Sequence, residues 1–432
     1  MVNIDELYLA FRSSTGVCTD TRTLLEGGMF FALKGPNFDA NSFSEKALDS
    51  GCSCAVVDDA SVVKSERFLL VPDVLKALQE LGQHHRRQFN VPVIAITGTN
   101  GKTTTKELTH AVLSAHAPTL ATIGNLNNHI GVPLTLLRMT RDHRFAIIEM
   151  GANHIGDIAE LTAIAEPTHG MVTNIGKAHL EGFGGFEGVV RAKSEMYDHL
   201  TSEQGTVFVN SDDELLMRKT EGMDRVTYGT ISSPPPFLLG NEEGSAGPYL
   251  SCRIVHDDQN GLIATRLIGS YNLPNVLAAA CIGFYFGIQG KLVFDALAAY
   301  EPTNNRSQFK DTGRNQLVLD AYNANPSSMK VALENFAAMR SDRSKLAILG
   351  GMKELGAASR SEHSGIVELA SKLGLKCIFV GPEFMELENM GITVHLDANA
   401  ALDAFMQKPL TGQLILVKGS RGTKLESLLP GL

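Results

Sequence analysis

Apolar and polar residues alternate along the chain in blocks that predict helices and strands in turn. Leucines at helical spacing share one face of a predicted helix over residues 74–88, and Asp73 is placed to cap its N-terminus. Residues 91–97 then form a continuous apolar run, typical of a strand buried on both faces of a parallel sheet. Further strand-like runs lie at residues 145–150, 169–175 and 205–210. Strands that alternate with helices predict a parallel, doubly wound sheet in the middle of the chain.

Both ends of the chain show the same class of pattern. Before residue 84, the sequence predicts strands within residues 27–33 and 54–59 and a helix that ends at Gly51. After a break near residues 300–308, strand-like runs separated by helical patterns lie at residues 315–322, 345–351, 376–381 and 412–419. We therefore predict an α/β protein of three domains, with boundaries at residues 1–84, 85–300 and 301–432.

Two other segments complete this outline. Residues 230–248 are rich in turn formers and predict a surface excursion. Residues 275–288 predict a buried helix, and the apolar run within it is too short to span a bilayer. The first residues lack the basic start and long apolar stretch of a signal peptide. We expect a cytoplasmic protein without membrane insertion.

Composition and charge narrow the class of partner. The 432 residues are 44% hydrophobic and 20% charged, which is ordinary for globular domains. The net charge of −9 would repel a nucleic-acid backbone, so we expect no nucleic-acid partner, although one local cationic loop could still hold a small phosphorylated ligand. Cys52 and Cys54 form the one close cysteine pair and have no second pair or nearby histidine to complete a zinc set.

The strongest local signal is a glycine-rich turn that follows the strand at residues 91–97. There the sequence GTNGKTTT leads directly into a predicted helix. Small residues let backbone N–H groups close around phosphate oxygens, and the helix N-terminus adds positive potential. Lys102 is placed to reach the β and γ phosphates, and the hydroxyl of Thr103 to bind Mg²⁺. The general pattern has glycine where this chain has Ile96, and the first glycine here is Gly98.

Candidate acidic, imidazole and amine groups follow the next strands. Glu149 ends a strand, where it could hold Mg²⁺ together with Thr103 or simply cap a turn. His179 lies in a glycine-rich stretch after the following strand, and Lys193 lies on a predicted helix beyond it. On spacing alone, Lys193 reads as a solvated helix residue.

Several amide and charged residues remain open between a ligand role and a local structural one. Asn127 and Asn128 could bind phosphate or carboxylate, or could form turns. Asn272 and Asn275 could contact a purine edge or cap a helix. Two charged residues at or near the last predicted domain also have two possible roles. Asp320 could bind a ribose or form a turn, and Arg306 could bind a phosphate or form a surface ion pair.

Together, these motifs resemble those of the Mur ligase family, the ATP-dependent amide ligases of peptidoglycan precursor synthesis. The resemblance covers essentially the whole chain. The motifs occur in the family's order and read GTNGKTTT, EMGANHIGDI, TNIGKAHLEGFG, AKSE, GSYNLPN, NNRSQ, DAYNANPSSM and LVKGSRG. The resemblance implies a small N-terminal α/β substrate domain, a central P-loop-type parallel-sheet domain that binds ATP, and a C-terminal Rossmann-like α/β domain.

Within the family, the chain looks most like the members that join D-alanyl-D-alanine to UDP-N-acetylmuramoyl-tripeptide. Residues 16–40, the DAYNANPSSM motif and the segment GGMKELG…H at residues 350–363 carry this likeness. It implies that the tripeptide carboxylate attacks the γ-phosphate of ATP and that the dipeptide amine displaces phosphate from the resulting acyl phosphate. The implied cofactors are ATP, two Mg²⁺ ions and a carbamate on a lysine. We expect the domains to close on these substrates, and nothing in the sequence demands more than a monomer.

The resemblance also assigns roles residue by residue. It implies that Lys102 and Thr103 hold phosphate and the first metal with Glu149, that His179 holds the second metal, and that Lys193 is the carbamylated lysine. The implied ATP-binding residues are Gly98, Thr99, Asn100, Gly101, Lys102, Thr103, Thr104, Asn272, Asn275, Asp320 and Tyr322. The implied substrate-binding residues are Thr21, Arg22, Lys34 and Asn37 for the uridine diphosphate, with Asn128 and Lys418. The resemblance also makes Arg306 a catalytic cation that closes on the phosphates.

The chain departs from the family pattern at a few positions. Ala40 and Asn41 stand where the family more often has Gly and His, and His129 stands where an acidic residue is commoner. Two other functions remain open: a related ligase that adds a different amine, and a P-loop switch that hydrolyses nucleotide without making an amide. The implied carbamate on Lys193 favours a ligase, because a nucleotide switch does not require a carbamylated lysine.

Overall fold

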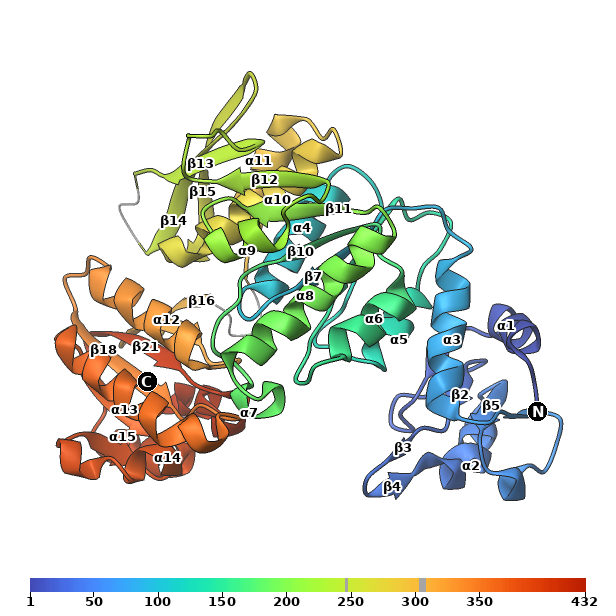
Figure 1. Cartoon of the computed structure of the whole chain (residues 1–432). Coiled ribbons are helices and arrows are strands. Elements are labelled where there is room, and N and C mark those ends of the chain that lie inside the picture. The colour runs from blue at the N-terminus through green and yellow to red at the C-terminus, as the bar shows by residue number, and fades with distance from the viewer. Residues whose placement is uncertain (245–247, 303–307) are drawn as a thin grey trace.

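The first part of the chain folds around a four-stranded parallel sheet in the order β1–β2–β5–β6. The computed structural model describes residues 1–244, 248–302 and 308–432 (Figure 1). Helices α1 and α3 pack on one face of this sheet and α2 on the other. The strands are Val17–Cys18, Met29–Phe31, Cys54–Val57 and Phe68–Leu70, and the helices are α1 (Ile4–Ser13), α2 (Ser44–Asp49) and α3 (Val74–Arg86). A separate hairpin consists of β3 (Lys34–Gly35) and β4 (Phe38–Asp39).

Helix α3 joins this part to the middle of the molecule (Figure 1). Its predicted N-cap is confirmed, because the side chain of Asp73 accepts a 2.8 Å hydrogen bond from the backbone N–H of Lys76. The far end of the helix is tied down by Arg87, whose guanidinium binds the carboxylate of Glu166. Helix α3 extends past residue 84, and the division of the chain at residues 84 and 300 stays a prediction.

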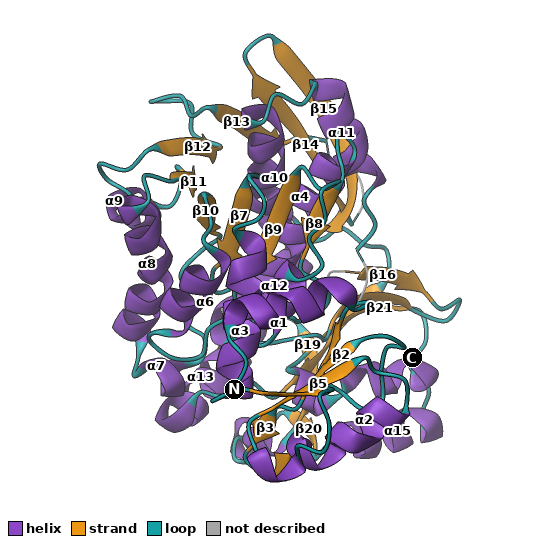
Figure 2. Cartoon of the chain, turned by 90° about the vertical axis from the view of Figure 1, so that its right-hand side faces the viewer, coloured by secondary structure: helices purple, strands orange, loops and turns teal. Residues whose placement is uncertain are grey.

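The middle of the chain forms a nine-stranded sheet in the order β15–β14–β13–β12–β11–β10–β7–β9–β8. Figure 2 shows this order from β12 on the left to β8 on the right. The strands from β7 to β13 are parallel, as the alternating pattern predicts. The strands are β7 (Val93–Thr97), β8 (Thr119–Ala121), β9 (Phe145–Glu149), β10 (His169–Val172), β11 (Thr206–Asn210), β12 (Arg225–Gly229), β13 (Leu238–Glu242), β14 (Tyr249–His256) and β15 (Gln259–Ile268).

The prediction of a surface excursion at residues 230–248 is wrong in part. Strand β13 lies within this segment and pairs with β12 and β14. Leu238 is fully buried there, against the helix that the sequence placed at residues 275–288. The sequence signal failed because a tract rich in proline and glycine flanks a short strand whose stability comes from its neighbours in the sheet.

Helices cover both faces of the middle sheet. One face is covered by α4 (Lys102–Ser114), α10 (Leu273–Tyr285) and α11 (Gly290–Ala299), and α10 is buried as predicted. The other face is covered by α5 (Gly131–Leu136), α6 (Asp157–Ala165) and α8 (Phe186–Ser202), with the short helix α7 (Leu180–Phe183) at the start of α8. Helix α9 (Glu214–Lys219) follows β11. Among the described residues, no helix has the length and apolar character needed to cross a membrane.

The last part of the chain contains a six-stranded sheet in the order β16–β17–β21–β18–β19–β20. The four predicted strand runs correspond to β17, β18, β19 and β21, which are parallel, and β16 adds an antiparallel edge. The strands are β16 (Gln308–Asp311), β17 (Gln316–Asp320), β18 (Ser344–Gly350), β19 (Lys376–Val380), β20 (Thr393–His395) and β21 (Gln413–Lys418). The helices are α12 (Pro326–Ala338), α13 (Ser359–Lys372), α14 (Pro382–Met385) and α15 (Ala398–Gln407).

Candidate active site at the seam between two sheets

A cavity of about 970 Å³ lies between the middle and the C-terminal parts of the chain, at the boundary that we call the seam. Parallel sheets bind ligands at the carboxyl ends of their strands, and the cavity collects loops that follow β7, β9 and β10 on one side and β17 and β21 on the other. The predicted site residues that line it are Thr99, Asn100, Gly101, Lys102, Thr103, Thr104, Asn128, Glu149, His179, Asn272, Asn275, Asp320, Tyr322 and Lys418.

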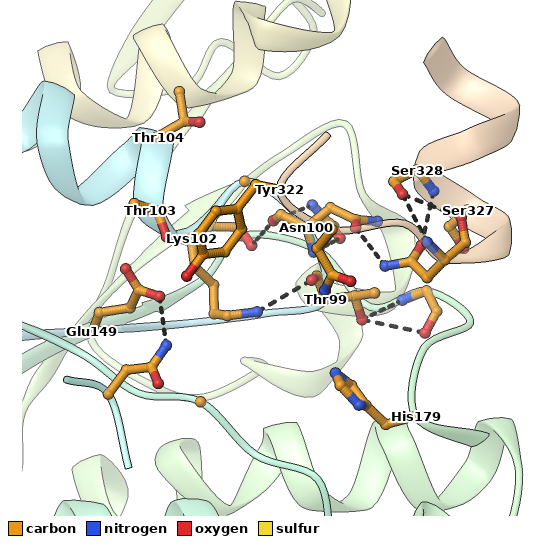
Figure 3. Close-up of a pocket in the computed structure, with 18 of the residues that line it drawn as sticks. Thr99, Asn100, Lys102, Thr103, Thr104, Glu149, His179, Tyr322, Ser327 and Ser328 are labelled. Carbon is orange, nitrogen blue, oxygen red and sulfur yellow. Dashed lines mark hydrogen bonds between the residues drawn. The ribbon is translucent and has the colours of Figure 1, made fainter. Parts of the chain in front are cut away.

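The turn between β7 and α4 is packed too tightly for side chains at its glycines. Gly98 has φ +139°, and a Cβ there would lie 2.0 Å from Oγ1 of Thr173. Gly101 has φ +79°, which glycine adopts without the strain other residues meet. Helix α4 begins at Lys102, whose Nζ donates to the backbone carbonyl of Gly98 at 2.6 Å. The same Nζ donates to the carbonyl of Thr99 at 3.1 Å (Figure 3). The N-terminus of α4 and the ammonium of Lys102 therefore lie close together, and both provide the positive potential that a phosphate requires. We call residues 98–101 the phosphate-type turn.

Asn100 joins this turn to both sides of the seam. Its backbone N–H donates to Oδ1 of Asn174 at 3.1 Å, and its carbonyl accepts a 2.6 Å hydrogen bond from Oγ1 of Thr173. Its side-chain Oδ1 accepts a 2.8 Å hydrogen bond from Nδ2 of Asn325, which caps α12 in the C-terminal part. The phosphate-type turn is therefore hydrogen-bonded directly to the last domain.

Glu149 presents an unpaired carboxylate oxygen to the cavity. Its Oε1 accepts a 2.8 Å hydrogen bond from Nδ2 of Asn127, and its backbone N–H donates to Oγ1 of Thr122 at 3.0 Å. Its Oε2 is buried and has no hydrogen-bond partner among the described residues. A buried carboxylate oxygen without a partner is costly unless a cation binds it, so the donor set fits Mg²⁺. The sequence leaves two roles open for Asn127, a ligand contact or a turn. The structure shows that its amide orients Glu149.

His179 contacts the C-terminal part across the seam. Its backbone is left-handed, with φ +50°, and the ring points toward the cavity (Figure 3). Its Nδ1 is in direct contact with Oε2 of Glu354. Burial lowers the pKa of His179, and the Glu354 charge opposes this. A neutral imidazole is the form that binds a metal ion. The segment that carries Glu354 contributes to the family likeness, but no role for the residue itself was predicted, because its partner His179 is distant in the chain.

Lys193 is buried in α8 rather than solvated. The residue is 3% exposed and does not line the cavity, and its Nζ lies 5.7 Å from the centre of the Phe183 ring. No hydrogen bond from its ammonium is found in the part of the chain that the structure describes. Burial, followed by the nearby Lys102 charge, lowers the pKa of Lys193 well below its ordinary value. Burial therefore favours the neutral amine over the ammonium at this position.

Asn272 and Asn275 use their amides to hold the phosphate-type turn in place. Nδ2 of Asn275 donates to Oδ1 of Asn272 at 2.9 Å, and Oδ1 of Asn275 accepts from Oγ1 of Thr105 at 3.1 Å. A Cβ at Gly101 would lie 2.6 Å from Oδ1 of Asn275. Both residues line the cavity, and these hydrogen bonds support the helix that begins at Lys102.

Asp320 and Lys418 face each other at the ends of two paired parallel strands. Register places Asp320 of β17 opposite Lys418 of β21, and Nζ lies 2.5 Å from Oδ2. Lys418 is 2% exposed, and the carbonyl of Asn323 is its other neighbour, at 3.4 Å. The Arg421 guanidinium lies 5.7 Å from the centre of the Tyr322 ring, which also lines the cavity.

The other predicted residues lie away from the cavity, accept hydrogen bonds from backbone N–H groups, or lie outside the described residues. Thr21, Arg22, Lys34 and Asn37 lie in the N-terminal part and do not line the cavity. Oδ1 of Asn128 accepts from the backbone N–H groups of Ile130 and Gly131, so it caps a helix at the cavity wall. Arg306 lies outside the described residues.

Comparison with known proteins agrees with this geometry. Residues 96–283 match the Mur ligase middle domain, and residues 305–421 match the Mur ligase glutamate ligase domain. The chain belongs to the Mur ligase family. The matched middle domain contains the phosphate-type turn and Glu149, and the matched C-terminal domain contains Asp320 and Lys418.

Relatives in the Mur ligase family cover nearly the whole chain. A UDP-N-acetylmuramoyl-tripeptide–D-alanyl-D-alanine ligase of Escherichia coli is 35% identical over 99% of this chain and 95% of its own. The protein of the same name from Bacillus subtilis is 33% identical over 96% and 93%. Among solved structures, MurF from Acinetobacter baumannii has a TM-score of 0.88 at 30% identity, covering 99% of this chain and 98% of its own. MurF ligase from Thermotoga maritima, solved with ADP, has a TM-score of 0.85 at 25% identity, covering 98% and 97%.

The buried pair of Asp320 and Lys418 generates a stability prediction. Asp320→Ala leaves the ammonium of Lys418 buried without its carboxylate, and we expect a loss of about 3 kcal/mol in the free energy of unfolding. The double variant Asp320→Ala/Lys418→Met removes both charges and should recover most of that loss. Urea unfolding of the three proteins measures this. A double variant no more stable than the single one would contradict the buried-pair explanation.

Proposed function

We propose that the chain is an ATP-dependent ligase that joins D-alanyl-D-alanine to the terminal carboxylate of UDP-N-acetylmuramoyl-tripeptide. The observation that carries this is the seam cavity, which has a phosphate-type turn on one side and Asp320 with Lys418 on the other. Full-length relatives that are named for this reaction support the choice of substrates. Family members that take other amines would share the cavity. The choice of D-alanyl-D-alanine as the amine therefore rests on the names of the relatives and not on the cavity.

The proposed reaction proceeds in two steps. A carboxylate oxygen of the tripeptide attacks the γ-phosphorus of ATP, ADP leaves, and the carboxylate becomes an acyl phosphate. The amine of the dipeptide then attacks the acyl carbon, an amide bond forms, and inorganic phosphate leaves with the loss of the amine proton. The protein's share is to hold the reacting groups in line and to offset the charge on the phosphoryl oxygens. The backbone N–H groups at the start of α4 and the ammonium of Lys102 would serve that purpose.

We further propose which residues hold the metal ions. Bound Mg²⁺ would neutralise phosphoryl charge and orient the attacking carboxylate. Thr103 and the unpaired oxygen of Glu149 suit the first ion, and His179 suits the second. The neutral amine of Lys193 would add to CO₂ and lose a proton, which gives an anionic carbamate in a place where a buried ammonium is disfavoured.

The remaining roles complete the proposal. Asp320 and Tyr322 would bind the ribose and base of ATP, with Asn272 and Asn275 near the adenine, and Lys418 would approach the transferred phosphate. Asn128 would contact nucleotide or substrate through its amide nitrogen, since its Oδ1 is already engaged. We also propose Arg306 as a cation that closes on the phosphates, and Thr21, Arg22, Lys34 and Asn37 as the uridine diphosphate pocket. The monomeric state and the cytoplasmic location stay predictions.

Release of phosphate by the purified protein tests the proposed reaction. With ATP and Mg²⁺ present, we expect release only when the UDP-linked tripeptide and D-alanyl-D-alanine are supplied together, with a product heavier by the dipeptide. Release with neither substrate would favour a nucleotide switch. Release with the tripeptide and a single amino acid, but not with the dipeptide, would assign a different amine.

Loss of the lysine side chain tests the carbamate. Lys193→Ala should reduce ligation to background because it removes the anion beside the metal site, and added formate should restore part of the rate. Arg191→Ala, at an exposed position on the same helix, serves as the control and should keep the parent rate. Steady-state rates at saturating ATP measure both. Full activity in Lys193→Ala would contradict the carbamate assignment.

A further inference from the structure

The segment GGMKELG, at residues 350–356, reaches from the C-terminal part toward His179. It follows strand β18 and carries Glu354. Glu354 has a left-handed backbone, with φ +62°, which costs a residue other than glycine about 1 kcal/mol or more. Such a conformation persists when the surrounding structure imposes it.

The loop is held from behind by contacts within the C-terminal part. Nε2 of the fully buried His363 accepts a 2.9 Å hydrogen bond from the backbone N–H of Met352, while Nδ1 of His363 donates to the carbonyl of Ser359 at 2.7 Å. The backbone N–H of Lys353 donates to Oγ of Ser420 at 3.2 Å. These bonds fix the backbone on the N-terminal side of Glu354 from within the C-terminal part.

At the seam, the carboxylate of Glu354 meets one particular nitrogen of His179. Oε2 of Glu354 contacts Nδ1, which is buried and has no other partner among the described side chains. An imidazole whose Nδ1 faces a carboxylate carries its proton on that nitrogen, which leaves the lone pair on Nε2. No described residue donates a hydrogen bond to Nε2, and the ring lines the cavity.

We propose that Glu354 is a positioning residue that orients His179 and fixes its tautomer, so that Nε2 binds the second metal ion. This inference rests on the proposed metal role of His179. Histidine ligands commonly give their other N–H to a carboxylate, and loss of that carboxylate typically weakens metal binding by about 10- to 100-fold. Here the carboxylate and the imidazole belong to different parts of the chain. The imidazole is therefore set for the metal only when the two parts are in contact.

A neighbouring ion pair provides the control for simple adhesion between the two parts. Lys177 and Glu362 meet across the same seam with Nζ and Oε1 2.8 Å apart, and neither is in the metal set. Replacing Glu362 removes one polar contact between the two parts, as does replacing Glu354. Only the second replacement changes the partner of His179.

Binding of Mn²⁺ to the full-length protein, followed by electron paramagnetic resonance, tests the proposal. The protein is held with a non-hydrolysable ATP analogue and the UDP-linked tripeptide, and free Mn²⁺ is titrated. We expect Glu354→Gln to weaken the second Mn²⁺ site about 10- to 100-fold, and Glu362→Gln to leave it within about twofold of the parent. His179→Ala should abolish that site.

Each alternative outcome has a separate meaning. Equal weakening in Glu354→Gln and Glu362→Gln would show that Glu354 only helps to hold the seam together, which overturns the proposal. Parent-like binding in Glu354→Gln, with the site lost in His179→Ala, would overturn the proposal and leave the metal role of His179 intact. Retention of the site in His179→Ala would contradict that metal role and the proposal together.

Discussion

The lack of space around the turn between β7 and α4 is the constraint on which the rest of the site depends. Thr173, the residue after β10, occupies the place of a side chain at Gly98, and Asn275 of α10 occupies that place at Gly101. The turn therefore keeps one backbone conformation. It holds the N-terminus of α4 and the side chain of Lys102 at a fixed place, where they offer positive potential. Glu149, His179 and Asn325 are all arranged around that place.

The second feature of the molecule is that the candidate site residues come from two sheets. The middle sheet supplies the phosphate-type turn and the candidate metal ligands, while the C-terminal sheet supplies Asp320, Lys418 and Glu354. Polar contacts across the seam, such as that between Asn100 and Asn325, are individually worth about 1 kcal/mol. Contacts of that size can form and break during a catalytic cycle, so an active site made at a seam can be assembled by its own substrates.

Much of this could be predicted from the sequence, because parallel strands have a strong local signature. The apolar runs identified β7, β9, β10 and the C-terminal strands, and the turn at Gly98–Thr104 was recognised from glycine and lysine spacing. Strand β13 was missed because its turn-rich flanks outweighed a short apolar stretch. The roles of Asn127 and Glu354 could not be predicted, since each depends on which distant side chain it meets. The burial of Lys193 was not predicted, although the sequence carries a signal for it: Val189, Val190, Met196 and Tyr197 stand three and four residues away and mark its face of α8 as apolar.

Small-angle scattering of the full-length protein tests most directly the claim that the site is assembled by closing the seam. Profiles are recorded for the protein alone and with a non-hydrolysable ATP analogue, Mg²⁺ and the UDP-linked tripeptide. The account predicts a smaller radius of gyration with ligands and a ligand-bound profile that fits the structure described here. Identical profiles with and without ligands would contradict it.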